Sequence, residues 1–223
     1  MAPALEIALA GATLRLLPQR AAFVPDHGAL LVADAHLGKA VSFRRLGVPV
    51  PSGTTQTALD TLTQLLHDTG ARHIVFLGDL LHAARARTAA TTEAVAAWRA
   101  RHAGVALTLV RGNHDRHAGD PPPEWRVQSV DEGLRLGPFA LVHHPQPVPG
   151  AYALGGHVHP AVVLGGRARD RLRLPCFHFG AQVGVLPAFG GFTGMHVLPR
   201  APGDRVYAIA QDSVLALPVR GAA

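Results

Sequence analysis

Residues 29–36 read ALLVADAH, and this stretch decides the fold class that the sequence predicts. Ala29 to Ala33 is a continuous apolar run, which is typical of a strand buried on both faces. The run ends directly in Asp34-Ala35-His36, so polar side chains stand where the buried strand stops. Because strand ends line the ligand crevice of open α/β sheets, we expect Asp34 and His36 to face such a crevice.

Strand and helix signals alternate along the first half of the chain, which predicts an α/β layered core. Leucines at helical spacing and an alanine-rich segment predict two helices between buried strands. The expected elements are the strands Leu5 to Ala8, Leu14 to Leu17, Ala21 to Val24, Ala29 to Ala33, His73 to Leu77 and Val105 to Val110, and the helices Thr54 to His67 and Thr88 to Arg101. Leu37 to Ser52 is expected to be irregular.

The second half is mostly β in pattern, because short apolar runs are separated by Gly and Pro. The expected strands are Phe139 to His143, Tyr152 to Gly155, Ala161 to Leu164, Leu172 to Leu174, Met195 to Leu198, Val206 to Ile209 and Val214 to Leu217. No internal repeat or Ser-rich linker divides the chain. We therefore expect residues 1–223 to form one domain.

Composition limits the classes of protein to consider. The chain has 223 residues, of which 48% are hydrophobic and 16% charged, so it is too apolar to be disordered. A net charge of +6 favours partners that carry negative charge. The single cysteine, Cys176, excludes an internal disulfide and any multi-cysteine zinc site. No apolar run approaches the roughly 18 residues of a membrane span and no basic residue precedes the N-terminal apolar stretch, so a soluble, cytoplasmic protein without membrane contacts is expected.

Five polar clusters follow apolar runs, and their residue types suit metal ions. They are Asp34-x-His36, Gly78-Asp79-x-x-His82, Gly112-Asn113-His114-Asp115, His143-His144 and Gly156-His157-x-His159. A mixture of imidazole and carboxylate favours manganese, iron or zinc. The glycines beside three of these side chains permit tight turns in a crowded centre. Each histidine taken singly is more simply an ordinary polar residue, and His144 is expected to point to the opposite strand face from His143.

These motifs, in this order, resemble the five motifs of calcineurin-like metallophosphoesterases. DAHLG, GDLLH and GNHD are similar to the branch that includes the double-strand-break repair nucleases. LPCF (174–177) and LPAFGGFTG (186–194) resemble the bacterial DNA ligase-associated metallophosphoesterases, a group of DNA damage response endonucleases and phosphodiesterases. The resemblance spans essentially the whole chain. It implies an α/β sandwich of two mixed β-sheets flanked by helices, with metal ions between the strand ends.

The resemblance also implies a role for each matching position. It implies two divalent metal ions, with Mn²⁺ expected first and Fe²⁺, Zn²⁺ or Mg²⁺ as alternatives. The first would be held by Asp34, His36 and His159, the second by Asn113, His143 and His157, and both by Asp79. The resemblance further implies that His114 is the general acid, that Asp115 orients it, and that His82 helps to position the substrate.

The expected function is hydrolysis of phosphodiester bonds, in DNA and during repair. The family setting implies an ATP-dependent DNA ligase, a helicase and an exonuclease as functional partners. Arginines that follow the first three motifs are expected to contact DNA phosphates: Arg44, Arg45, Arg85, Arg87 and Arg116. Two alternatives stay open, namely hydrolysis of a small nucleotide or phosphomonoester, and a catalytically inactive scaffold. The natural substrate, the physiological metal, strand preference, endonuclease against exonuclease action and the oligomeric state are left undetermined by the sequence.

Overall fold

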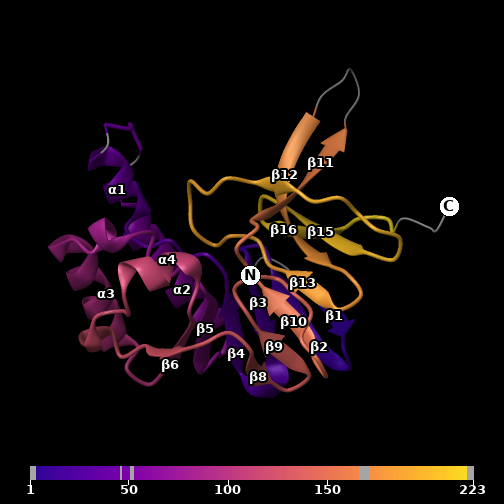
Figure 1. The fold of residues 1–223 in the computed structure, drawn as a ribbon, viewed down its shortest axis with the longest axis horizontal. Helices are drawn as coiled ribbons and strands as arrows, with labels where there is room; N and C mark the ends of the chain where they lie inside the picture. The colour runs from indigo at the N-terminus through magenta and orange to yellow at the C-terminus, as the bar shows by residue number, and fades with distance from the viewer. Residues whose placement is uncertain (1–3, 46, 51–52, 166–170, 220–223) are drawn as a thin grey trace.

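The protein consists of two β-sheets packed face to face, with helices on one side (Figure 1). The structure is a computed structural model that describes residues 4–45, 47–50, 53–165 and 171–219. In these ranges the first sheet has the order β1 (Leu5–Leu9), β2 (Ala12–Leu17), β3 (Ala21–Val24), β4 (Ala29–Val32), β5 (His73–Leu77), β6 (Ala106–Val110) and β7 (Gln128–Val130). The second has the order β14 (His196–Val197), β11 (Pro160–Gly165), β12 (Arg171–Phe179), β13 (Val183–Val185), β10 (Tyr152–Gly155), β9 (Phe139–Leu141) and β8 (Leu134–Leu136). Strand β12 also pairs with β15 (Arg205–Ala210), which pairs with β16 (Ser213–Ala216).

The helices are α1 (Lys39–Arg45), α2 (Thr54–Thr69), α3 (Ala89–Arg101) and α4 (Asn113–Ala118), and there are short 3₁₀ turns at Pro25–His27, Ala84–Ala86 and Pro123–Trp125. Helices α2 and α3 cover the outer face of the first sheet (Figure 1). The left-handed Gly70 ends α2 by donating its backbone N–H to the Leu66 carbonyl. The hydroxyl of Thr88 begins α3 by accepting from the Thr91 amide.

Alternation along β4 explains why its sequence is apolar at every position. Leu30 and Val32 pack against the leucines of α2 and against Trp98 of α3. Leu31 and Ala33, which point the other way, pack between the two sheets with Phe177 and Leu154. The predicted strand, buried on both faces, is therefore confirmed.

The parallel strands determine where the polar clusters lie. Strands β4, β5 and β6 pair in parallel in the first sheet, and β9 and β10 do so in the second. Parallel strands present their carboxyl ends at one edge of a sheet. The predicted clusters that follow these five strands therefore meet at a common edge, between the two sheets.

The structure differs from the sequence expectations in several elements. Helix α1 occupies part of the segment that was expected to be irregular, because two turns are too short to show a periodicity. The strands β7, β8 and β13 were not predicted, since three residues give no readable alternation. Strand β12 continues beyond Leu174, through Pro175. This proline lies where β12 changes partner, from β11 at Ala161 to β15 at Ala208, so its missing N–H breaks no continuous ladder.

No helix in the described part of the chain is both long enough and apolar enough to cross a membrane.

Replacing Phe177 by Ala tests the packing between the sheets. The Phe177 side chain is fully buried there. The substitution should lower the free energy of unfolding by about 3–5 kcal/mol, through lost burial and a residual cavity. Urea unfolding followed by the fluorescence of Trp98 and Trp125, which belong to the other cluster, measures this change. Leu172→Ala on the same strand is the control, because Leu172 is 57% exposed; an equal loss in both variants would contradict the assignment.

Candidate metal centre

The side chains that follow the five parallel strands come together in three groups of possible metal ligands. Within each group the nitrogen or oxygen atoms all lie within 4.8 Å of one another. The groups are Asp34, His36 and His159; Asp34, Asp79 and His143; and His143, His144 and His157. The first contains the three residues that the resemblance implied for one metal. The second shares Asp34 with the first and His143 with the third, so it connects the two.

In the first group, Asp34 is fully buried and His36 nearly so. Oδ1 of Asp34 lies 3.7 Å from Nε2 of His159. Nδ1 of His159 lies 3.2 Å from the carbonyl oxygen of Gly194, which makes it the donating nitrogen of the ring. This hydrogen bond leaves the lone pair on Nε2, on the side of Asp34, as a metal ligand requires.

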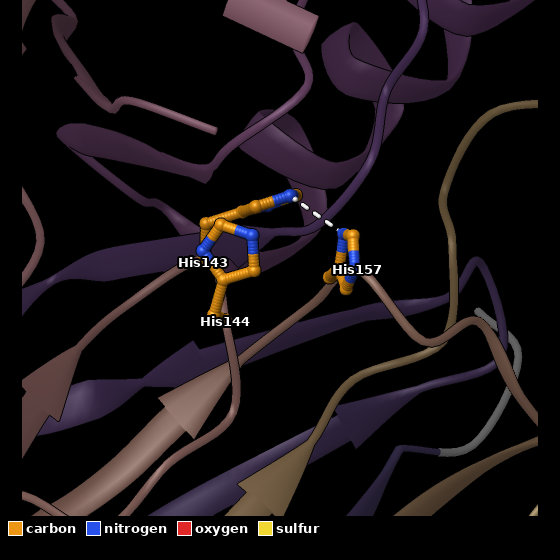
Figure 2. A group of neighbouring side chains, drawn as sticks. All are labelled: His143, His144 and His157. Carbon is orange, nitrogen blue, oxygen red and sulfur yellow. Dashed lines mark hydrogen bonds between the residues drawn. The ribbon is translucent and has the colours of Figure 1, made fainter. Parts of the chain in front are cut away.

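The side chain of His143 is at the centre of the other ligand positions. Nδ1 of its ring donates to the Leu77 carbonyl oxygen, 3.0 Å away. Nε2 then faces Oδ1 of Asn113 at 2.9 Å and Nδ1 of His157 at 3.1 Å. Figure 2 shows the His143 and His157 rings turned toward each other. Asn113, His143 and His157, which the resemblance implied for the second metal, are thus brought together.

Asp79 lies between the groups, as its expected bridging position requires. Its Oδ1 is 3.5 Å from Nε2 of His143 and accepts from the backbone N–H of His114 at 3.0 Å. Its Oδ2 is 3.8 Å from Nε2 of His114. Burial, and then the negative charge of Asp34, raise the pKa of Asp79.

The polar atoms of this centre fit divalent cations. Among the described residues, Asp34 Oδ1 and both ring nitrogens of His36 are buried and have no hydrogen-bond partner. Histidines are the only basic groups that approach Asp34 or Asp79 within 4 Å in the described ranges. Burial, followed by the charge of Lys39, lowers the pKa of His36 to about 2, so its imidazole is neutral. Neutral imidazoles beside unpaired carboxylates form the donor set of a transition-metal site.

The backbone is strained at this centre. Five of the seven expected ligands have positive φ angles: Asp34, His36, Asp79, His157 and His159, with values between 47° and 66°. This left-handed conformation is uncommon for residues other than glycine, and such strain concentrates at functional sites. It turns each side chain away from the strand direction and into the gap between the sheets.

Three glycines make room for the ligands, as the sequence predicted. A Cβ atom at Gly78 would lie 2.0 Å from the His143 ring, one at Gly112 would lie 2.4 Å from Oδ1 of Asp79, and one at Gly156 would lie 2.5 Å from Oδ2 of Asp34. Of these three glycines, only Gly78 has a positive φ. At Gly112 and Gly156 glycine is needed because a Cβ atom would clash with the neighbouring carboxylate.

The structure corrects the expected role of Asp115. Its buried carboxylate accepts backbone hydrogen bonds from Asp79 at 2.6 Å, Leu80 at 3.0 Å and Gly112 at 2.9 Å. The Leu81 amide also donates to it, at 3.4 Å, and among the described residues no hydrogen bond or ion pair joins this carboxylate to the His114 ring. Asp115 therefore holds together the two loops that follow β5 and β6, and does not orient His114 directly.

The expectation for His144 is also wrong. Strand β9 ends at Leu141, so the alternation of a strand does not apply to His143 and His144. The ring of His144 lies 4.6 Å from that of His157, between centroids, and on the same side as His143 (Figure 2). Its Nδ1 lies 2.8 Å from Oε1 of Glu132, whose Oε2 accepts from the amides of both histidines. The sequence analysis missed Glu132, which no motif marks.

His114 and His82 stand beside the metal ligands. Their rings stack with centroids 5.2 Å apart, and each ring lies edge-on to His36, at 5.5 Å from His114 and 5.4 Å from His82. The side chain of His114 is 40% exposed, so a substrate can reach it. Lys39 also lies here: burial lowers its pKa, and the charges of Asp34 and Asp79 oppose this shift. The sequence analysis noted Lys39 only as the single lysine, although it follows His36 by three positions.

The five arginines expected to bind phosphate have different surroundings. Arg44 is exposed on α1, and Arg116 is exposed on α4. The guanidinium of Arg87 donates to the carbonyl oxygens of Gly119 and Asp120, so it holds the chain after α4. The side chains of Arg45 and Arg85 lie outside the described part of the structure.

Comparison with solved structures identifies the class of protein. The crystal structure of the nuclease MPE from Pseudomonas putida is 44% identical in sequence, superposes with a TM-score of 0.86, and covers 96% of this chain and 100% of its own. Yfce, a phosphoesterase from E. coli, covers 86% of this chain and 99% of its own, at 15% identity and a TM-score of 0.42, and carries no argument here. No family model and no curated protein matches the sequence.

This fold, the donor set between its sheets and the identity to a solved nuclease define a metallophosphoesterase. The chain belongs to the family of the nuclease MPE, within the calcineurin-like metallophosphoesterases. It is a metal-dependent phosphoesterase.

Replacing Gly156 by Ala tests whether the crowded geometry is needed for metal binding. The new methyl group would displace the Asp34 carboxylate, so bound metal should fall while the fold persists. Metal content after dialysis, measured by mass spectrometry, and the circular dichroism spectrum report the two effects. Gly104→Ala is the control, because a Cβ there has no atom within 4 Å. Unchanged metal content in Gly156→Ala would show that Asp34 is not a ligand in this position.

Proposed function

We propose that the chain hydrolyses phosphodiester bonds in DNA, with two divalent metal ions held between the sheets. The observation that carries this proposal is the convergence of three ligand groups, which are joined to one another through the buried residues Asp34 and His143. The net charge of +6 favours a polyanionic substrate, and the related MPE protein is a nuclease. A cytoplasmic DNA repair setting with a ligase, a helicase and an exonuclease is part of the same proposal.

The residues divide into two sets of ligands around a shared carboxylate. Asp34, His36 and His159 would hold one ion, Asn113, His143 and His157 the other, and Asp79 both. His144 is a further imidazole within reach of the second set. Mixed nitrogen and oxygen donors favour Mn²⁺, with Fe²⁺, Zn²⁺ or Mg²⁺ as alternatives. When bound, such ions would neutralise phosphate charge and lower the pKa of a water molecule.

His114 is suited to protonate the leaving oxygen. Its amide is held by Asp79 Oδ1, and its ring is supported by the stacked His82 ring, so the imidazole is positioned without being buried. A positioned and partly exposed histidine can act as a general acid. His82 would position this ring, and so contribute to substrate positioning indirectly.

Two variants separate metal binding from proton transfer. Asp79→Ala should lose both metal and activity, because both ligand sets depend on this carboxylate. His114→Ala should retain its metal and lose rate by about 100- to 10,000-fold, the usual contribution of a general acid. Metal content and the hydrolysis rate of a chromogenic phosphodiester measure the two effects. His67→Ala, an exposed histidine on α2, is the control; loss of metal from His114→Ala would make His114 a ligand.

Substrate class is tested by parallel assays with manganese on a phosphodiester chromogen, a phosphomonoester chromogen, and single- and double-stranded DNA. DNA cleavage together with diester hydrolysis supports the proposal. Activity confined to the monoester or to small nucleotides supports the alternative. Inactivity of the metal-loaded protein on all four substrates supports the scaffold.

The double substitution Arg44→Ala and Arg45→Ala should weaken DNA binding. Each lost phosphate contact releases fewer counterions, so the plot of log affinity against log salt should flatten by up to about two units. Hydrolysis of a small diester should not change, because the centre is untouched. Arg101→Ala is the control, since the end of α3 lies at the opposite edge of the sheet from the centre. Equal loss on both substrates would assign these arginines to the shape of the catalytic centre.

A further inference from the structure

A pocket of about 400 Å³ lies beside the metal centre and has no role in the proposed mechanism. Its volume is in the range of sites for small molecules, which are about 300–1,000 Å³. The turn between β2 and β3, the first half of α2, the loop 189–192 and the turn between β15 and β16 line it. Arg20, Thr54, Phe189, Phe192 and Asp212 are among its lining residues.

The pocket adjoins the metal centre through shared walls. A smaller hollow lined by His36 shares Thr54, Ala58 and Gly191 with it. The loop between them is pinned to the first ligand motif, because the Gly190 amide donates to the carbonyl oxygen of Asp34 at 3.1 Å. A Cβ at Gly190 would lie 2.5 Å from the carbonyl oxygen of Ala35, so this close approach requires glycine. The pocket and the hollow at His36 are therefore neighbours, divided by this loop and the start of α2.

The loop that forms this wall also contacts a metal ligand at its other end. The carbonyl oxygen of Gly194 accepts from Nδ1 of His159. The Thr193 hydroxyl donates to the carbonyl oxygen of Gly190, 3.3 Å away, and closes the loop on itself. The position of the pocket wall is thus coupled to that of the centre.

Arg20 and Asp212 both line the pocket, but the two side chains do not pair with each other. The guanidinium of Arg20 is half-buried, and no hydrogen bond or ion pair of its side chain occurs within the described residues, not even with Asp212 across the pocket. Burial lowers the pKa of Arg20, as expected for a cation without a partner. The pocket also contains the start of α2, whose cap, Gly53, supplies no side chain to the free amides. Both features attract an anion such as phosphate.

An aromatic ring faces the same pocket. Phe192 is 49% exposed, although a large apolar side chain is more stable when buried. Its φ of 57° is in the left-handed region, which is a genuine outlier for a bulky residue. Such strain persists where the surrounding structure imposes it, as the anchored glycines do here. Phe189, buried beneath, supports an apolar wall.

We propose that this pocket binds one unpaired nucleotide of the substrate strand, adjacent to the phosphate held at the metal centre. Its phosphate lies against Arg20 and the start of α2, and its base stacks on Phe192. This inference rests on the proposed DNA substrate and extends it, because a base can present its face to Phe192 only when it is not stacked inside a duplex. The base in this pocket is therefore one that is unstacked from its neighbours in the strand.

Binding of a fluorescein-labelled single-stranded oligonucleotide to the metal-loaded full chain tests the proposal. It is measured by anisotropy in the His114→Ala background, in which hydrolysis is slow and the metal is retained. Phe192→Leu should weaken binding by about 5- to 150-fold, which corresponds to about 1–3 kcal/mol for one stacked base. Phe192→Tyr should bind like the unmodified chain. Binding of a blunt duplex should not respond to either substitution.

Charge in the pocket is tested with Arg20→Gln, which should flatten the salt slope of single-strand binding by about 0.7 unit, the value for one phosphate contact. Arg101→Gln removes the same charge at the opposite edge and should leave the slope unchanged. Circular dichroism and thermal melting establish that each variant is folded.

Three outcomes would overturn the inference. Unchanged binding by Phe192→Leu, in a protein that binds and cleaves DNA, would reject the pocket and leave the proposed function intact. Complete displacement of the oligonucleotide by thymidine monophosphate at comparable concentration would assign the pocket to free nucleotides. Hydrolysis of the chromogenic diester without binding or cleavage of any DNA would reject the DNA substrate, and the inference with it.

Discussion

Two carboxylates, those of Asp34 and Asp79, are buried side by side where the parallel strands end, and the loops around them are arranged to accommodate this pair. They are at most 2% exposed, and in the described part of the chain no lysine or arginine pairs with either. Like charges that are both buried and close are unfavourable, as the raised pKa of Asp79 reflects. The described structure places imidazoles around them, of which the buried His36 is neutral. Divalent cations would balance the two negative charges, so metal binding would stabilise the folded centre.

The backbone around this centre is shaped to bring the side chains into contact. The left-handed conformation of most expected ligands, the three glycines and the hydrogen bonds of Asp115 all act at the ends of parallel strands. None of these features strengthens the core between the sheets, which consists of ordinary alternating apolar residues. The packed core is rigid, and it holds the residues at the strand ends in their strained backbone conformation.

The loop 189–194 contacts both the metal centre and the pocket proposed to bind a nucleotide. Its amides and carbonyls are held by the chain at Asp34 and by the ring of His159, while its Phe192 side chain faces the neighbouring pocket. A nucleotide that contacts Phe192 would act on the loop whose Gly194 carbonyl oxygen accepts from Nδ1 of His159, and this hydrogen bond fixes the tautomer of that histidine. Strand binding and the geometry of the centre are thus physically connected.

The buried strands could be predicted from the sequence alone, because an apolar run followed at once by polar residues is a local pattern. The family and the expected ligands followed from the resemblance of five short motifs, which are also local. Ala29 to Ala33 could be read as doubly buried from its composition alone. The partners of Asp115, the side on which His144 lies, the contact of Glu132 and the pocket between Arg20 and Phe192 were decided only by the tertiary structure. Asp115 meets Asp79 across 36 positions, and His144 turns inward because β9 stops at Leu141. Contacts between segments distant in the chain, and the residue at which a strand ends, depend on how the two sheets pack, which no local pattern records.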